Sequence, residues 1–210
     1  MSADQLTRPA ALRAARRLNV VTITWNVAEA AVALAAGAVA GSLSLVAFGL
    51  NSCIEVSVAL VLTWRLARER RDDCRQPDDR RATRAMALGF FALSGYVVVA
   101  SMLSLTGGSR PDASAVGIVV AVASLTLMPV LARAKRRLAP VLGSRAQERE
   151  ARQTQLCALL SGVVLVGLGL NAALSWWWAD PAAALVVAGL AAAEGVRSWR
   201  AESLEDTCCV

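Results

Sequence analysis

Six blocks of apolar residues, each about 20 residues long, constrain this chain more than any other feature of its sequence. The blocks span residues 19–41, 43–64, 85–105, 114–132, 154–175 and 180–196. An α-helix of about 20 apolar residues is long enough to cross the hydrocarbon core of a bilayer. Ala, Gly, Val and Leu surround the whole helical circumference of these blocks, which lack the polar face of a helix in a soluble bundle. We therefore predict six transmembrane helices.

The composition supports this prediction, because 56% of the 210 residues are hydrophobic and only 18% are charged. The mean hydropathy of +0.50 is too high for most soluble domains of this size. The first block follows several arginines, as a secretory signal would, but it is longer than a signal core and a second block follows almost at once. We predict an all-α membrane protein of the cell membrane. Its six-helix bundle would occupy residues 19–200, with short cytoplasmic segments at 1–18 and 201–210.

Basic residues lie almost entirely on one side of the predicted bundle. Of the 22 Lys and Arg residues, only Arg110 falls in a connection on the opposite side. Short loops rich in Lys and Arg normally stay in the cytoplasm, so both termini are predicted to be cytoplasmic. The same residues explain the net charge of +6. Their expected partners are the anionic headgroups of the bilayer rather than nucleic acid.

The connecting segments are too polar to build a second domain. Residues 65–84 read as a mixed-charge linker, and residues 133–152 are similar. Pro140 and Gly143 are expected to break any long helix in the second of these segments.

Two acidic residues of the sixth block have local structural interpretations. Asp180, directly before Pro181, is predicted to be the N-cap of the sixth helix. Glu194 lies three residues before Arg197, a spacing that predicts an ion pair on one helix face.

The five cysteines form no disulfide framework. Cys53 and Cys157 lie within predicted spans, whereas Cys74, Cys208 and Cys209 lie on the predicted cytoplasmic side, where thiols stay reduced. The adjacent Cys208 and Cys209 could bind metal, carry an acyl chain, or do neither.

The chain contains no histidine, which limits the chemistry available to it. A metal site or a proton carrier must use carboxylate, thiolate, amide or hydroxyl groups. No pair of nucleophile and base and no cofactor motif indicates an enzyme or a tightly bound cofactor.

An amide and a carboxylate interrupt the second apolar block. Asn51 and Glu55 are four residues apart, so they share one helix face about 6 Å apart along the axis. Counted from Ser42, Glu55 lies about 20 Å below the external interface. An ionised carboxylate at that depth costs a few kcal/mol unless it is partnered, which makes Glu55 a candidate functional residue. The alternative is a structural Glu55 that bonds a neighbouring helix or reaches towards the cytoplasm.

Polar residues also share faces of the first and fifth blocks. Asn26 and Glu29 are three residues apart, and Gln153, Cys157 and Ser161 follow one another at intervals of four. Lipid cannot satisfy such groups, so they must face one another or a hydrated path. We expect a polar interior lined by the first, second and fifth helices.

Two parts of the sequence resemble a known family. Residues 25–56, "WNVAEAAVALAAGAVAGSLSLVAFGLNSCIEV", resemble the first two spans of the cation diffusion facilitator transporters. Residues 176–200, "WWWADPAAALVVAGLAAAEGVRSWR", resemble the sixth span of that family, with an A-D-P turn at its start and E-G near its end. The resemblance covers all six spans and identifies a short form, without the cytoplasmic domain that usually follows them.

The resemblance implies a homodimeric exporter of divalent cations, usually zinc, that is driven by inward proton flow. It also implies a four-ligand metal site with two ligands on the second helix and two on the fifth. Carried over by position, the ligands are Asn51 and Glu55 on the second helix and, if one residue of slack is allowed before the sixth helix, Gln153 and Cys157 on the fifth. Without that slack the fifth-helix positions are Thr154 and Ala158, and Ala158 cannot ligate a metal. Asn26, Glu29 and Ser161 are possible further residues of the pathway.

This ligand set departs from the family pattern, because an amide and a thiol replace two of the expected groups. Oxygen and sulfur ligands suit zinc or another borderline-soft ion better than magnesium or calcium. Cys157 is predicted to lie about 28 Å from the external surface, deeper than Asn51, so Ser161 is an alternative partner. A second hypothesis is a membrane protein that keeps this scaffold for assembly or metal sensing without transport.

Overall fold

The computed structural model describes residues 8–68, 77–107, 110–142 and 145–200 and consists of six long helices. Every one of these helices is long and apolar enough to cross a membrane. The predicted all-α bundle of six transmembrane helices is therefore confirmed. The helices are α1 Arg8–Ala40, α2 Leu43–Arg68, α3 Pro77–Gly107, α4 Ala115–Leu142, α5 Arg145–Leu174 and α6 Ala179–Arg200.

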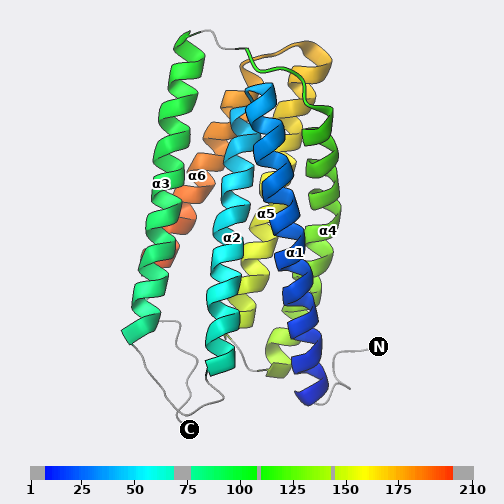
Figure 1. Cartoon of the computed structure of the whole chain (residues 1–210), viewed down its shortest axis with the longest axis vertical. Helices are drawn as coiled ribbons and strands as arrows, with labels where there is room; N and C mark the ends of the chain where they lie inside the picture. The colour runs from blue at the N-terminus through cyan, green and yellow to red at the C-terminus, as the bar shows by residue number, and fades with distance from the viewer. Residues whose placement is uncertain (1–7, 69–76, 108–109, 143–144, 201–210) are drawn as a thin grey trace.

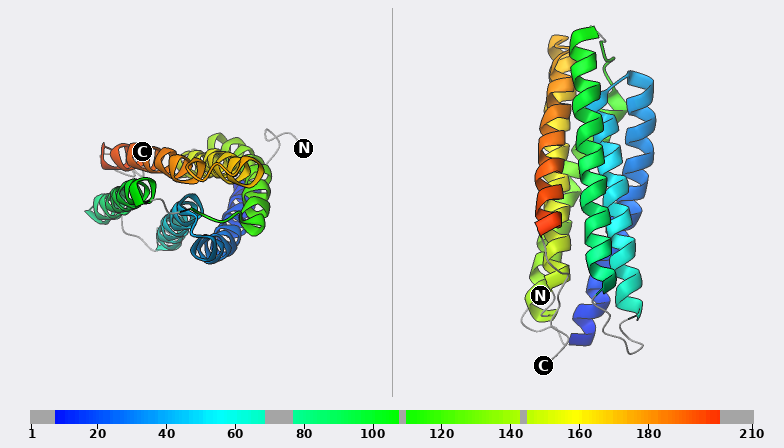
Figure 2. Two further views of the ribbon diagram at one scale, coloured as in Figure 1. Left: turned by 90° about the horizontal axis from the view of Figure 1, so that it is seen from above. Right: turned by 90° about the vertical axis from the view of Figure 1, so that its left-hand side faces the viewer.

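Successive helices run in opposite directions, as Figure 1 shows. The closest packing joins α4 to α5, α3 to α6 and α1 to α2. Helices α1, α2, α4 and α5 group together, and the α3–α6 pair lies beside them (Figure 2). We call the end where α1 starts and α2 ends the basic end, and the end with the α1–α2 turn the far end. That the basic end faces the cytoplasm stays a prediction.

Several helices extend further than the apolar blocks predict. α3 begins at Pro77 and α5 at Arg145, so parts of the segments 65–84 and 133–152, which were expected to be linkers, are helical. α4 continues through Pro140 but ends at Leu142, and α5 begins at Arg145, so no single helix spans residues 133–152, as expected. Pro140 lies in the last turn, where a missing N–H costs little beyond one backbone hydrogen bond. α1 already begins at Arg8, within the segment that was predicted to flank the bundle. Helices can continue past the hydrocarbon because water and headgroups solvate their polar side chains.

The α1–α2 turn at the far end is held by a residue from α6. Gly41 has a φ of 63°, and the N–H of Ser42 donates to the carbonyl of Gly37 at 3.0 Å. This pattern is a Schellman cap, in which glycine adopts the left-handed conformation at low cost. Immediately after it, Asp180 approaches the N-terminus of α2.

Asp180 caps α2 rather than its own helix, so the prediction that it is the N-cap of α6 was wrong. α6 begins at Ala179, which places Asp180 inside its first turn. The fully buried carboxylate accepts hydrogen bonds from Ser42 Oγ at 2.6 Å, Leu43 N at 2.8 Å, Ser44 N at 3.4 Å and Ser44 Oγ at 2.5 Å. A helix N-terminus has unpaired N–H groups and a positive dipole end, both of which favour this carboxylate.

At the basic end, Glu194 Oε2 lies 3.4 Å from Arg197 Nη1, which confirms the predicted local ion pair. Cys74, Cys208 and Cys209 lie outside the described residues.

Close helix approach depends on glycine at the α5–α6 contact. A Cβ atom placed on Gly167 would lie 2.6 Å from the Cβ of Ala183. Such a distance is too short for two carbon atoms, so a side chain at this position would push the helices apart.

Candidate functional site

Two polar residues of α2 point into the centre of the bundle. The Asn51 amide donates from Nδ2 to Glu55 Oε1 at 2.8 Å. Asn51 and Glu55 are only 2% and 4% exposed. Both face protein rather than lipid, as the four-residue spacing predicts.

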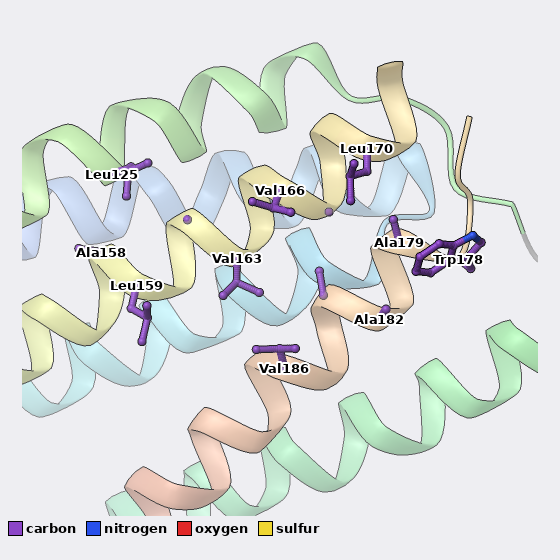
Figure 3. Close-up of a pocket in the computed structure, with 13 residues that line it drawn as sticks. Leu125, Ala158, Leu159, Val163, Val166, Leu170, Trp178, Ala179, Ala182 and Val186 are labelled. Atoms are coloured by element: carbon purple, nitrogen blue, oxygen red, sulfur yellow. The ribbon is translucent and has the colours of Figure 1, made fainter. Parts of the chain in front are cut away.

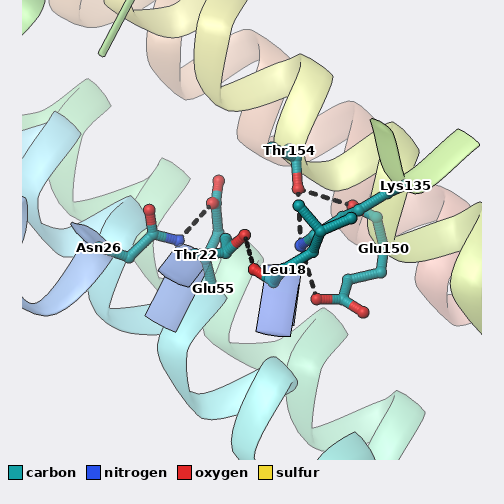
Figure 4. Close-up of polar contacts among 7 residues, drawn as sticks. All are labelled: Leu18, Thr22, Asn26, Glu55, Lys135, Glu150 and Thr154. Atoms are coloured by element: carbon teal, nitrogen blue, oxygen red, sulfur yellow. Dashed lines mark hydrogen bonds and ion pairs between the residues drawn. The ribbon is translucent and has the colours of Figure 1, made fainter. Parts of the chain in front are cut away.

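A second amide reaches the same carboxylate from α1. Asn26 Nδ2 donates to Glu55 Oε2 at 2.9 Å, and Figure 4 shows this contact. Each oxygen of Glu55 therefore accepts one amide N–H. The carbonyl oxygen of Asn26 is buried and has no hydrogen-bond partner. A buried acceptor without a donor costs free energy, so this oxygen is available to an incoming cation.

Glu29, the second carboxylate of the interior, joins four helices. Its Oε1 accepts from Ser52 Oγ of α2 at 2.5 Å and from Cys157 Sγ of α5 at 3.6 Å. Its Oε2 accepts from Trp25 Nε1 of α1 at 2.8 Å and from Ser124 Oγ of α4. The side chain is only 2% exposed, so these donors satisfy both of its oxygens inside the bundle.

Cys157 connects α5 to Glu29. Its fully buried thiol donates to Glu29 Oε1. The hydroxyl of Ser161, the alternative partner, is instead bonded to the backbone carbonyl of Cys157 at 2.8 Å. Gln153 is half-buried, and the neighbouring Thr154 is the buried residue of that turn. The role of Gln153 as a ligand stays a prediction.

We refer to Asn26, Glu29, Asn51, Glu55 and Cys157 as the Glu55 cluster. It holds two carboxylates, one thiol and two amides, and Glu29 and Glu55 are close enough to interact electrostatically. In the described part of the chain, no three Asp, Glu or Cys residues already have the arrangement of a metal site. The cluster is therefore closed by its own hydrogen bonds, and a cation has to replace amide or thiol donors to bind a carboxylate.

Sequence reasoning missed the part of this network that α4 supplies. Ser124 is a single hydroxyl in an apolar block, and nothing in its local pattern distinguishes it from the serines that bond their own helix. Trp25 and Ser52 are each adjacent in sequence to a predicted site residue, and this adjacency was the sequence signal that could have identified them. The predicted interior of the first, second and fifth helices therefore also includes α4.

A groove of about 570 Å³ between α4, α5 and α6 has a different character (Figure 3). Its lining is apolar and includes Leu125, Leu159, Val163, Val166 and Val186. These side chains offer no ligand to a cation. The Glu55 cluster is consequently the better candidate for binding an ion.

Comparison with known proteins identifies the family of the chain. Residues 83–204, more than half of the chain, match the family model described as the cation efflux transmembrane domain. The matched segment contains Cys157 and Ser124 and ends beyond α6. No curated protein matches the chain.

Proposed function

This chain belongs to the cation efflux family, and we propose that it exports divalent metal cations, zinc or a similar borderline-soft ion, in exchange for protons. Family membership and six apolar helices make it a multi-pass membrane protein of cation transport. The choice of ion, the coupling to protons and a homodimeric assembly are parts of the proposal.

The observation that carries the proposal is the environment of Glu55. Its carboxylate is buried in the middle of a membrane helix, and amides from two helices surround it. Beside it lies the unpartnered carbonyl oxygen of Asn26. In a purely structural site every buried acceptor should have a donor. The Asn26 oxygen has none, and an unpaired buried acceptor costs free energy. A cation that binds Glu55 and the amide oxygens removes that cost.

Binding requires the two amides to change their role. Asn26 and Asn51 both donate N–H groups to Glu55 in the structure. When a cation binds Glu55, rotation of each amide presents an oxygen to the cation. The site then combines one carboxylate, two amide oxygens and the Cys157 sulfur. Sulfur favours zinc over magnesium or calcium. Gln153 remains a predicted further ligand.

Proton exchange follows from the same groups. A carboxylate or thiol must give up its proton before it ligates a metal ion. Loading from the basic end therefore expels protons, and protons that arrive from the far side compete with the ion and promote its release. Glu55 is the proposed proton carrier, since amides do not titrate.

The test is zinc uptake into liposomes that contain the purified protein, with and without a pH gradient. We expect Glu55→Gln to reduce uptake at least tenfold, because Gln keeps the shape of the side chain and removes its charge. Glu194→Gln is the matched control, because this carboxylate forms an exposed ion pair outside the cluster. Normal uptake by Glu55→Gln would refute the proposed site. A wild-type protein without zinc uptake would instead favour the scaffold or sensing hypothesis.

A further inference from the structure

A fully buried ammonium group lies between the Glu55 cluster and the basic end. Lys135 of α4 is 0% exposed. Its Nζ lies 2.7 Å from Glu150 Oε1 and donates to Thr154 Oγ1 at 3.3 Å, both on α5 (Figure 4). The Glu150 side chain is 10% exposed, so it marks the outer side of this contact.

Lys135 lies on the side of the Glu55 cluster that faces the basic end, next to Glu150. Thr154 and Glu150 precede Cys157 by three and seven residues, which places them about 5 and 10 Å nearer the basic end. Figure 4 shows Glu55 on one side of Thr22 and the Lys135 contacts on the other. Lys135 thus lies between Glu150, which it contacts directly, and the carboxylates of the cluster further inside.

Stability alone is a weak explanation for this ion pair. Removing two charges from water is costly, and apolar replacements of similar volume are often neutral or stabilising for a buried pair. A buried ammonium beside a cation site also opposes binding of the ion, because like charges repel. The cost of burying Lys135 is explained if its repulsion of the bound ion has a functional role.

We propose that Lys135 is a resident positive charge that competes with the transported cation for Glu55, and that Glu150 controls the strength of this competition. The inference rests on the proposed cation site. With the site empty, Lys135 partly neutralises the buried carboxylates. With an ion bound, its repulsion lowers the affinity and favours release. Glu150 is a positioning residue, because its contact holds Lys135 back from Glu55.

The two residues should therefore affect zinc binding in opposite directions. Removing a unit charge on the order of 10 Å from a divalent ion, at an effective dielectric constant of about 20, corresponds to roughly 300-fold tighter binding. Relaxation reduces this value, so we expect Lys135→Gln to tighten zinc binding at least about tenfold. Glu150→Gln should weaken it several-fold, because Lys135 then interacts more strongly with Glu55. The double variant should bind like Lys135→Gln, since Glu150 acts through Lys135.

Isothermal titration of purified protein with Zn²⁺ measures these affinities, and thermal melting in detergent reports on folding. The matched controls are Glu148→Gln and Arg152→Gln, which alter an exposed ion pair on the same helix. Lys135→Met, which keeps the length of the side chain, replaces Lys135→Gln if that variant does not fold. If the Lys135 and Glu150 variants both weaken binding, or both leave it unchanged, the competition does not exist and the pair is structural.

A second measurement needs no metal and separates this inference from the proposed function. In a protein with serine at the other four cysteine positions, Cys157 is labelled with a cationic and a neutral methanethiosulfonate reagent of similar size. The ratio of the two rates cancels the intrinsic reactivity of the thiol. We expect Lys135→Gln to raise the cationic-to-neutral ratio several-fold and Glu150→Gln to lower it. An unchanged ratio refutes the role of Lys135, whereas absent zinc binding with a changed ratio refutes only the proposed cargo.

Discussion

Replacing Asp180 by Asn tests whether the far end of the bundle depends on the charge of this carboxylate. The substitution keeps the size of the side chain but leaves it one acceptor oxygen. Ser42 Oγ and Ser44 Oγ can still donate to that oxygen, because hydroxyls rotate. The backbone N–H groups of Leu43 and Ser44 would then face an NH₂ group. Leu43 is partly buried and Ser44 is buried, and the N–H groups of both lose their acceptor.

The size of the effect follows from these contacts. A hydrogen bond to a charged group contributes about 1.5–3 kcal/mol, and the 2.8 Å bond from Leu43 N is the main one lost. The weaker 3.4 Å bond from Ser44 N and the interaction with the helix dipole add roughly 1 kcal/mol. We expect Asp180→Asn to lower the free energy of unfolding by about 2–4 kcal/mol. For a chain of this size, that corresponds to a melting temperature lower by roughly 5–15 °C.

The assay is the loss of monodisperse protein after heating in detergent, followed by size-exclusion chromatography. Asp112→Asn is the control, since Asp112 lies at the same end, is exposed, and contacts Ala40 through its backbone N–H. A Ser44→Ala variant completes a double-mutant cycle, in which the two effects should nearly add, because the Ser44 hydroxyl can still donate to the oxygen that asparagine keeps. A melting temperature within 1–2 °C of wild type would show that water or another group replaces the carboxylate, and the reasoning about α2 would fail.

The remaining predictions concern the site and the orientation of the bundle. Asn51→Asp should tighten zinc binding, and its affinity should fall more steeply as the pH is lowered, because a second carboxylate must lose its proton first; titration at two pH values measures both effects. Cys157→Ser should weaken cadmium binding at least about tenfold and manganese binding much less, since a soft ligand is lost; competition between the two ions against a fluorescent chelator measures this difference. In a cysteine-free protein, Asp112→Cys should react with a membrane-impermeant thiol reagent in intact cells and Glu148→Cys only after permeabilisation; the reverse pattern would invert the predicted topology.

Helix number and position were predictable from the sequence because lipid imposes a simple requirement. Each span must be about 20 residues long and apolar on all sides, so the six blocks can be recognised in the sequence without knowledge of how the helices pack. The exact ends were less predictable. α4 carries Lys135 and Pro140 well beyond its apolar block, because the bilayer does not limit a helix once it leaves the hydrocarbon.

The candidate site was predictable only where the polar pattern is local. The spacing of Asn51 and Glu55 placed them on one face, and the same argument grouped Asn26 with Glu29. Contacts between helices were beyond this reasoning, since they depend on rotation and crossing of whole helices. Asp180 illustrates the limit. Its sequence position suited the cap of its own helix, but the donors it contacts lie about 138 residues earlier in the chain.

The single point at which Asp180 attaches α6 to α2 has a mechanical consequence. In the described part of the chain, the hydrogen bonds that join these two helices gather at the far end, and the rest of their contact is packing. Apolar surfaces slide over one another at lower cost than hydrogen bonds break. α6 therefore resembles a lever that is hinged at one end. A helix of 22 residues is about 33 Å long, so a tilt of roughly 10° about Asp180 displaces its other end by about 6 Å. A small rotation at the hinge is thus magnified at the basic end, where the α3–α6 pair lies beside the other four helices.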